Sequence, residues 1–139
     1  MTARRFKRRR IARTDLEVTT LGLGGASLAG IFSAVPAEQA LATVAHALVV
    51  RAASPRPVVS TKVGRLLKPV DPAVQDKGNW VDPLPFDQVY DYSYDGIMRS
   101  HADSLQRLGL ERVDILYVHD IGVATHGDEA NKPLWEQLA

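Results

Sequence analysis

Two stretches decide the fold of this chain: VVSTK at residues 58–62 and VDILYVH at residues 113–119. Each is strand-like and ends in a side chain capable of chemistry, Lys62 in the first and His119 in the second. Both are apolar on both faces, which is typical of parallel strands that lie between helices and a barrel interior. An α/β barrel holds its reactive groups at the carboxyl ends of such strands. The alternative is a solvated lysine at one strand end and a histidine that caps the sheet at the other.

Length and composition limit the classes of protein that fit. At 139 residues the chain makes one domain at most, well short of the roughly 250 residues of a complete eight-fold barrel. The absence of cysteine excludes disulfide scaffolds, thiolate metal sites and cysteine nucleophiles. No apolar run approaches the ~18 residues of a membrane span, and no apolar segment of a secretory signal follows the basic start. We therefore expect a cytoplasmic protein with no membrane partner.

The net charge of +1 hides a strong asymmetry along the chain. Residues 1–13 hold seven of the 17 basic groups and no acid, so the remainder has ten basic and 16 acidic groups, a net charge of −6. A basic arm can bind nucleic acid or another anionic surface. Because Phe6 is its only aromatic residue and no nucleic-acid module follows, we expect a solvated basic tail over 1–13 and a single domain over 14–139.

Three helices are predicted, over residues 36–50, 94–108 and 128–138. The second has Ser93 as N-cap and Gly109 as a left-handed stop. Apolar residues recur at helical spacing in the first two helices. The residues that share one face are Ala40, Leu41, Val44, Ala47 and Leu48 in the first helix, where they form an apolar stripe, and Ile97, His101, Leu105 and Leu108 in the second.

The intervening segments are predicted from turn and strand signals. Residues 10–18 suggest a hairpin around Thr14-Asp15, and residues 21–25 a brief buried strand that runs into a glycine turn. Residues 63–94 are predicted to be a long loop, and loops of that length are functional or poorly ordered. The repeated alternation of strand and helix favours a parallel sheet with right-handed crossovers.

Other site motifs in the chain are weak. The glycine cluster at residues 22–27 lacks the third glycine and the later acid of a dinucleotide fingerprint, so its glycines more simply allow close backbone approach. The four histidines have no ligand spacing, and no metal site is predicted. His119 and Asp120 are adjacent, but neighbouring strand residues face opposite ways, which argues against a paired role.

Several motifs, in the right order, resemble those of bacterial aldo-keto reductases. They are the opening segment, a third-strand motif, a third helix and a fourth strand, at residues 13–25, 60–65, 104–109 and 114–119. Phe86-Asp87 and Asp91-Tyr92-Ser93 are similar to the branch with pyridoxal 4-dehydrogenase-like and sugar dehydrogenases. The resemblance implies a (β/α)8 barrel, a TIM barrel, that moves a hydride between NAD(P)H and a small carbonyl or sugar-like substrate.

The resemblance also implies a set of site residues. The family's catalytic groups are an aspartate, a tyrosine, a lysine and a histidine, and Lys62 and His119 match the last two. The tyrosine donates a proton to the developing alkoxide, and the histidine polarises the carbonyl. The turn Gly24-Gly25-Ala26 is expected near the nicotinamide. The aspartate and tyrosine belong to a second-strand segment that has no counterpart before residue 58.

We therefore expect a partial barrel, roughly the N-terminal half without strand 2 and helix 2, with the later cofactor-binding strands absent. As substitutes the sequence offers Tyr90, Tyr92 and Tyr94, which lie in the long loop within possible reach, and Tyr117, which points inward two residues before its strand end. None matches the family's proton donor. Three interpretations remain open: an NAD(P)-dependent oxidoreductase with impaired activity, a catalytically dead fragment, and a binding module that self-associates through open sheet edges.

Overall fold

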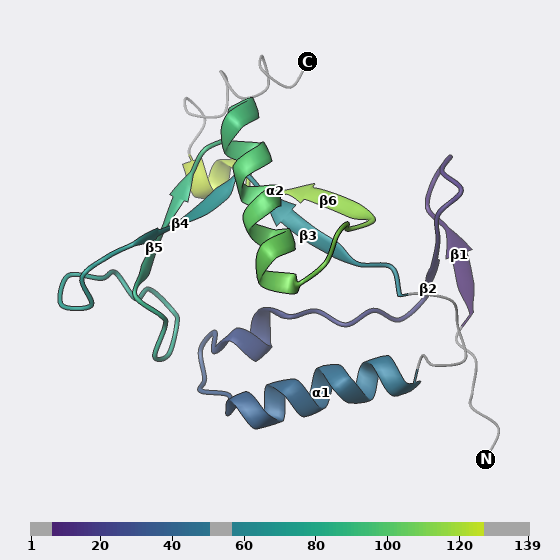
Figure 1. Cartoon of the computed structure of the whole chain (residues 1–139), viewed down its shortest axis with the longest axis horizontal. Coiled ribbons are helices and arrows are strands. Elements are labelled where there is room, and N and C mark those ends of the chain that lie inside the picture. The colour runs from purple at the N-terminus through teal and green to yellow at the C-terminus, as the bar shows by residue number, and fades with distance from the viewer. Residues whose placement is uncertain (1–6, 51–56, 127–139) are drawn as a thin grey trace. The chain divides into compact units, whose positions relative to one another are not determined.

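The computed structural model describes residues 7–50 and 57–126 of the chain (Figure 1). It divides into two compact units, the first made of Met1–Pro57 and Asp76–Leu84 and the second of Val58–Gln75 and Pro85–Ala139. The predicted helix at residues 128–138 lies outside the described residues.

The first unit begins with the predicted hairpin. Strands β1 (Arg8–Arg10) and β2 (Glu17–Thr19) pair antiparallel, with Arg9 opposite Val18. The side chain of Arg8 donates a hydrogen bond to the carbonyl oxygen of Glu17 at 2.9 Å and lies 3.7 Å from its carboxylate. The boundary that we expect after residue 13 therefore falls inside one hairpin, because part of the basic segment is a strand.

The rest of the first unit contains η1 (Ala26–Ala29), a 3-10 helix, and α1 (Ala37–Val50). The helix is confirmed, but its predicted apolar face is not buried among the described residues, since Leu41 is 71% exposed. The predicted buried strand at residues 21–25 is wrong: these residues form no strand, and both leucines are exposed. This run of two leucines and three glycines finds no strand partner among the described residues.

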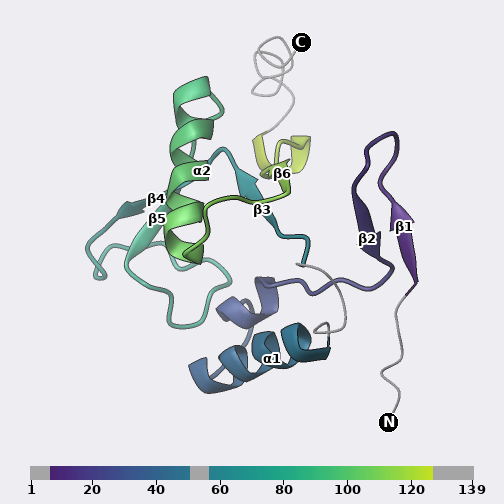
Figure 2. The same ribbon diagram turned by 45° about the vertical axis from the view of Figure 1, so that its right-hand side comes forward.

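The second unit contains the parallel pair that the sequence predicts. Strand β3 (Ser60–Val63) pairs with β6 (Ile115–Val118), and Lys62 lies opposite Tyr117. The ladder continues one residue further, because the amide of His119 donates to the carbonyl oxygen of Val63 at 2.9 Å. This register brings the ends of the two strands together (Figure 2).

Part of the predicted long loop is a second sheet. Strand β4 (Arg65–Pro69) pairs antiparallel with β5 (Phe86–Tyr90), and Arg65 lies opposite Tyr90. The prediction of a structureless loop over 63–94 is wrong for these residues. Gly64 separates β3 from β4 with a φ of +87°, a left-handed conformation that favours glycine. A single glycine thus redirects the chain from one strand pair into the other.

Helix α2 (Tyr94–Leu108) has the predicted ends. The Ser93 hydroxyl accepts a hydrogen bond from the Gly96 amide at 3.1 Å, and Gly109 ends the helix at a φ of +62°. The predicted apolar face is only partly covered: Ile97, His101 and Leu105 are half-buried and Leu108 is exposed, whereas the buried residues are the small ones at positions 96, 100 and 104. Small side chains let the helix approach β3 and β4 closely, so packing distance and not hydrophobicity selects the face (Figure 2).

Serine hydroxyls on this face satisfy backbone and side-chain partners of β3. Ser100 is 2% exposed and accepts a hydrogen bond from the Gly64 amide at 2.9 Å. The Ser104 hydroxyl donates to the Ser100 carbonyl oxygen within the helix at 2.8 Å and accepts from the Thr61 hydroxyl of β3 at 3.4 Å. Val63, 3% exposed, is the buried apolar residue of the described part of the chain. The helix is therefore held to β3 by polar contacts around a very small apolar core.

The described residues form an α/β fragment with three two-stranded sheets and no closed barrel. No helix in the described part of the chain is long and apolar enough to cross a membrane.

Candidate functional site

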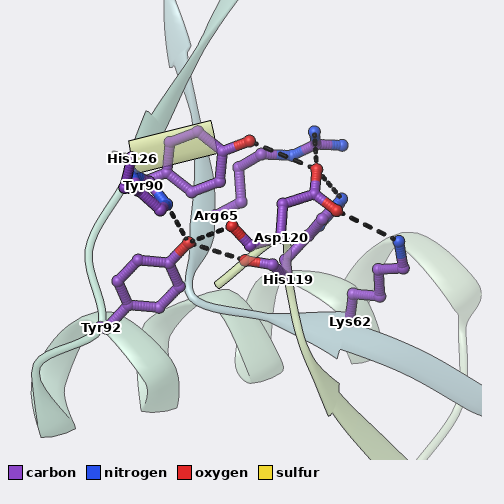
Figure 3. A network of polar contacts seen from close by, with 7 residues as sticks. All are labelled: Lys62, Arg65, Tyr90, Tyr92, His119, Asp120 and His126. Atoms are coloured by element: carbon purple, nitrogen blue, oxygen red, sulfur yellow. Dashed lines mark hydrogen bonds and ion pairs between the residues drawn. The ribbon is translucent and has the colours of Figure 1, made fainter. Parts of the chain in front are cut away.

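Lys62 and His119 meet at the carboxylate of a third residue, Asp120 (Figure 3). Lys62 comes from β3 and His119 directly follows β6, so the parallel pairing of these strands brings the two together. The Lys62 Nζ atom lies 3.8 Å from Oδ1 of Asp120, and His119 Nε2 lies 3.4 Å from Oδ2. An ammonium and an imidazole therefore share one small region at the strand ends.

Asp120 is the residue that the sequence argument misses. Alternation along a strand puts neighbours on opposite faces, but Asp120 lies beyond β6 and has a φ of +48°. This left-handed conformation turns its side chain back toward His119. The expectation that His119 and Asp120 face opposite ways is therefore wrong, because strand alternation does not extend past the strand end.

Two further side chains from β4 and β5 reach the same carboxylate. Arg65 Nη1 lies 3.7 Å from Oδ2 of Asp120, and the Tyr90 hydroxyl lies 3.4 Å from the same oxygen. The register of this antiparallel pair places Arg65 opposite Tyr90, which explains why they arrive together. All these contacts exceed the usual 2.7–3.2 Å of a direct hydrogen bond. They form a loose charge cluster, and each exposed ion pair contributes about 0–1 kcal/mol.

His119 lies in an environment that disfavours its charged form. Its side chain is 13% exposed, against 53% for Lys62. Burial lowers the pKa of His119 to about 4, and the nearby charges of Arg65 and Lys62 add to this effect, whereas Asp120 opposes it. His119 is therefore neutral near pH 7, and a neutral imidazole can donate a hydrogen bond from one nitrogen and accept at the other.

We predict that replacing Arg65→Gln raises the pKa of His119, because the variant removes a positive charge that lowers it. A histidine whose pKa in the folded state lies below its unfolded value of about 6.5 contributes stability above pH 6.5. That stability is lost as the pH falls from about 6.5 to about 4. Titration of the His119 ring protons by NMR measures the pKa, and urea midpoints across this range measure the stability.

The exposed Arg112 offers a matched control for this prediction. The Arg112→Gln variant removes the same charge outside the cluster, so the pKa of His119 should not change. An unchanged pKa in Arg65→Gln would contradict the prediction, and so would an equal change in both variants.

The tyrosines weighed as substitutes take different positions. The Tyr92 hydroxyl donates to the backbone carbonyl oxygen of His119 at 2.7 Å, and Tyr90 contacts Asp120. Tyr94 is 77% exposed at the start of α2, and Tyr117 lies opposite Lys62 and is half-exposed. Two of the loop tyrosines thus reach the cluster, Tyr90 at the end of β5 and Tyr92 just after it.

His126 completes the aromatic side of the cluster. Its Nε2 atom lies 2.7 Å from the Tyr92 hydroxyl oxygen, and its ring meets those of Tyr90 and Tyr92 edge-on, with centroids 4.6 and 5.4 Å apart. Burial raises the pKa of Tyr92 above its usual value, and the neighbouring Tyr90 and Asp120 add to this. The phenol of Tyr92 therefore remains protonated and able to donate.

The remaining predicted residues lie in the first unit. Gly25 precedes η1 and Ala26 is its first residue, and an added Cβ at Gly24 or Gly25 would have no atom within 4 Å. Their expected place beside a nicotinamide stays a prediction. Among residues 7–50 and 57–126, no group of three or more potential ligands could hold a metal ion.

Comparison with known proteins identifies relatives of this chain. The model of the Aldo/keto reductase family matches residues 26–138. Pyridoxal 4-dehydrogenase of Microbacterium luteolum is 39% identical over 88% of this chain and 45% of its own length. L-galactose dehydrogenase of Arabidopsis thaliana is 31% identical over 81% of this chain and 38% of its own. D-threo-aldose 1-dehydrogenase of a Pseudomonas species is 44% identical over 45% of this chain and 20% of its own.

The chain thus spans less than half the length of these relatives. The match to the Microbacterium protein is 155 positions long, and 88% of this chain is about 122 residues, so about 33 positions are occupied in the relative alone. No solved structure gives a significant match.

Proposed function

This chain belongs to the aldo/keto reductase family, and from that premise we propose that its site is an NAD(P)-dependent oxidoreductase site for a small carbonyl or sugar-like substrate, with impaired turnover in this chain. The observation that carries the proposal is the convergence of Lys62 and His119 at the ends of paired parallel strands. The names of the relatives, which are dehydrogenases of pyridoxal and of sugars, support the substrate class.

Each of these residues has a defined chemical task in the proposal. A neutral His119 donates a hydrogen bond to the carbonyl oxygen and polarises it, which its lowered pKa supports. Lys62 holds positive charge beside the reacting oxygen and stabilises negative charge that develops there. NAD(P)H supplies the hydride when it is bound. Both side chains can act on one substrate oxygen, because Lys62 Nζ and His119 Nε2 each lie within 4 Å of the same carboxylate, that of Asp120.

The proposed impairment rests on what the described residues do not provide. The family's aspartate and tyrosine have no counterpart between α1 and β3. The surplus of about 33 positions in the Microbacterium relative supports the loss of a strand and a helix, with their connections, from the interior of this chain. Loss of a general acid costs about 10²–10⁴ in rate. Gly24, Gly25 and Ala26 are exposed, and their place beside a nicotinamide stays a prediction, so we derive no step through the cofactor.

A second candidate function is self-association. Within the described residues, β6 pairs with β3 alone, and its Leu116 and Tyr117 are about half exposed. An unpaired strand with apolar side chains can pair with another chain. The module would then be a binding element without catalysis.

The test of the proposed function is oxidation of NADH and NADPH by the whole chain with pyridoxal and small sugar aldehydes. We expect slow, aldehyde-dependent oxidation, below the usual enzyme range of about 1–10³ per second. Turnover within that range would contradict the impairment. The binding module would be favoured by two results together. NADH and NADPH would not be oxidised in the presence of aldehyde even in a long end-point assay, and size-exclusion chromatography would show a dimer or larger species.

A further inference from the structure

Tyr92 joins the two strand ends that carry Lys62 and His119. Its hydroxyl donates to the carbonyl oxygen of His119 at 2.7 Å. Its ring lies over Gly64, which follows β3: a Cβ added to Gly64 would lie 2.5 Å from Cδ1 of Tyr92. Tyr92 therefore touches the backbone just after β3 and just after β6, as Figure 3 shows for the His119 side.

The backbone of His119 is held on both sides of the residue. Its amide donates to the Val63 carbonyl oxygen at 2.9 Å, and its carbonyl oxygen accepts from Tyr92. The first bond belongs to the strand ladder, but the second comes from a side chain that follows β5. Removing the hydroxyl of Tyr92 would leave the part of His119 that leads into the left-handed Asp120 without this restraint.

The proton on Tyr92 also determines the state of His126. A backbone carbonyl oxygen can only accept a hydrogen bond, so the single hydroxyl proton of Tyr92 points to His119. The Tyr92 oxygen also lies 2.7 Å from His126 Nε2, and because its own proton points to His119 it accepts a hydrogen bond from the N–H of that nitrogen. His126 therefore carries a proton on Nε2, and in the neutral ring Nδ1 has none.

We propose that Tyr92 is a positioning residue for His119, and that His126 supports it by donating to the Tyr92 oxygen. The catalytic meaning of this role rests on the proposed function, but the role itself is defined without cofactor or substrate. It predicts that loss of the Tyr92 hydroxyl alters the environment of the His119 ring, although the two side chains are joined only through the backbone of His119.

The test compares Tyr92→Phe with Tyr94→Phe in the whole chain. Both variants remove one phenolic hydroxyl, but Tyr94 is 77% exposed. In Tyr92→Phe the His119 ring becomes more hydrated, and its pKa, measured by NMR, should rise from about 4 toward its usual value. In Tyr94→Phe it should stay the same. A folded Tyr92→Phe variant with an unchanged pKa of His119 would overturn the proposal.

A second measurement keeps the proposal testable if Tyr92→Phe fails to fold. Nitrogen-15 shifts of His126 in the unmodified chain at neutral pH should show a proton on Nε2, and a neutral ring protonated only on Nδ1 would refute the proton assignment. His126→Gln retains an N–H donor and should keep the pKa of His119 low, whereas His126→Leu should raise it. If the pKa of His119 were the same in His126→Gln and His126→Leu, the supporting role of His126 would be excluded. None of these readouts depends on turnover, so they fail independently of the proposed function.

Discussion

Replacing Gly64→Ala is expected to lower the free energy of unfolding of the second unit by about 2–4 kcal/mol. Gly64 has a φ of +87°, where a side chain is strained, and an added Cβ would lie 2.5 and 2.8 Å from two ring atoms of Tyr92. The ring cannot move freely, because its hydroxyl is bonded to His119. Strain in the backbone and overlap with Tyr92 therefore add together.

The matched control for this prediction is Gly109→Ala. Gly109 also has a positive φ, +62°, but no atom lies within 4 Å of its added Cβ. Its replacement should cost about 1 kcal/mol, the conformational part alone. Urea denaturation followed by circular dichroism measures both variants. If both variants lose the same free energy of unfolding, the overlap with Tyr92 contributes nothing, and Tyr92 does not pack closely against Gly64.

The second large effect is expected on turnover. Lys62→Met and His119→Gln should each lower the aldehyde-dependent oxidation of NAD(P)H by about 10²-fold or more, because each removes or displaces a donor from the reacting oxygen. The charge of Lys62 is lost with its ammonium, and glutamine cannot reproduce the position of the imidazole nitrogen. The measurement is an end-point assay with pyridoxal or a sugar aldehyde, long enough to quantify a slow reaction.

Two variants with the same chemical changes serve as controls. Lys68→Met alters an exposed lysine of β4, and His46→Gln an exposed histidine of α1. Neither residue contacts Asp120 in the described part of the chain, and the rate should not change. A rate unaffected by Lys62→Met and His119→Gln would show that the residual turnover comes from elsewhere, which would refute the site.

The ends of α2 illustrate what a local pattern can predict. Ser93 and Gly109 cap the helix as expected, because capping depends on residues within a few positions of each end. The buried face of the same helix does not follow from its apolar pattern. Hydrophobicity favoured Ile97 and Leu105, but the helix lies close to β3, and only the small residues at positions 96, 100 and 104 fit there.

The cluster around Asp120 shows the same division. Lys62 and His119 could be selected from the sequence, because each ends a strand-like segment. Tyr90 could be named only as one of several loop tyrosines, and Arg65 could not be selected at all, because both join the cluster through the register of two strands in a segment predicted to be a loop. The sequence does not predict that Asp120 belongs to the site, because nothing in a non-glycine residue signals a positive φ just beyond a strand end.

The sequence by itself determined the parallel strand pair, both main helices, the family, and the lysine and histidine at the strand ends. These depend on periodicity, caps and local motifs, which act over a few residues. Only the tertiary structure decided which carboxylate lies between them and which tyrosine holds His119 in place. Those contacts join residues up to 58 positions apart, Lys62 and Asp120, through hydrogen-bond register and one glycine turn. Such contacts arise from packing and leave no periodic signal in the chain.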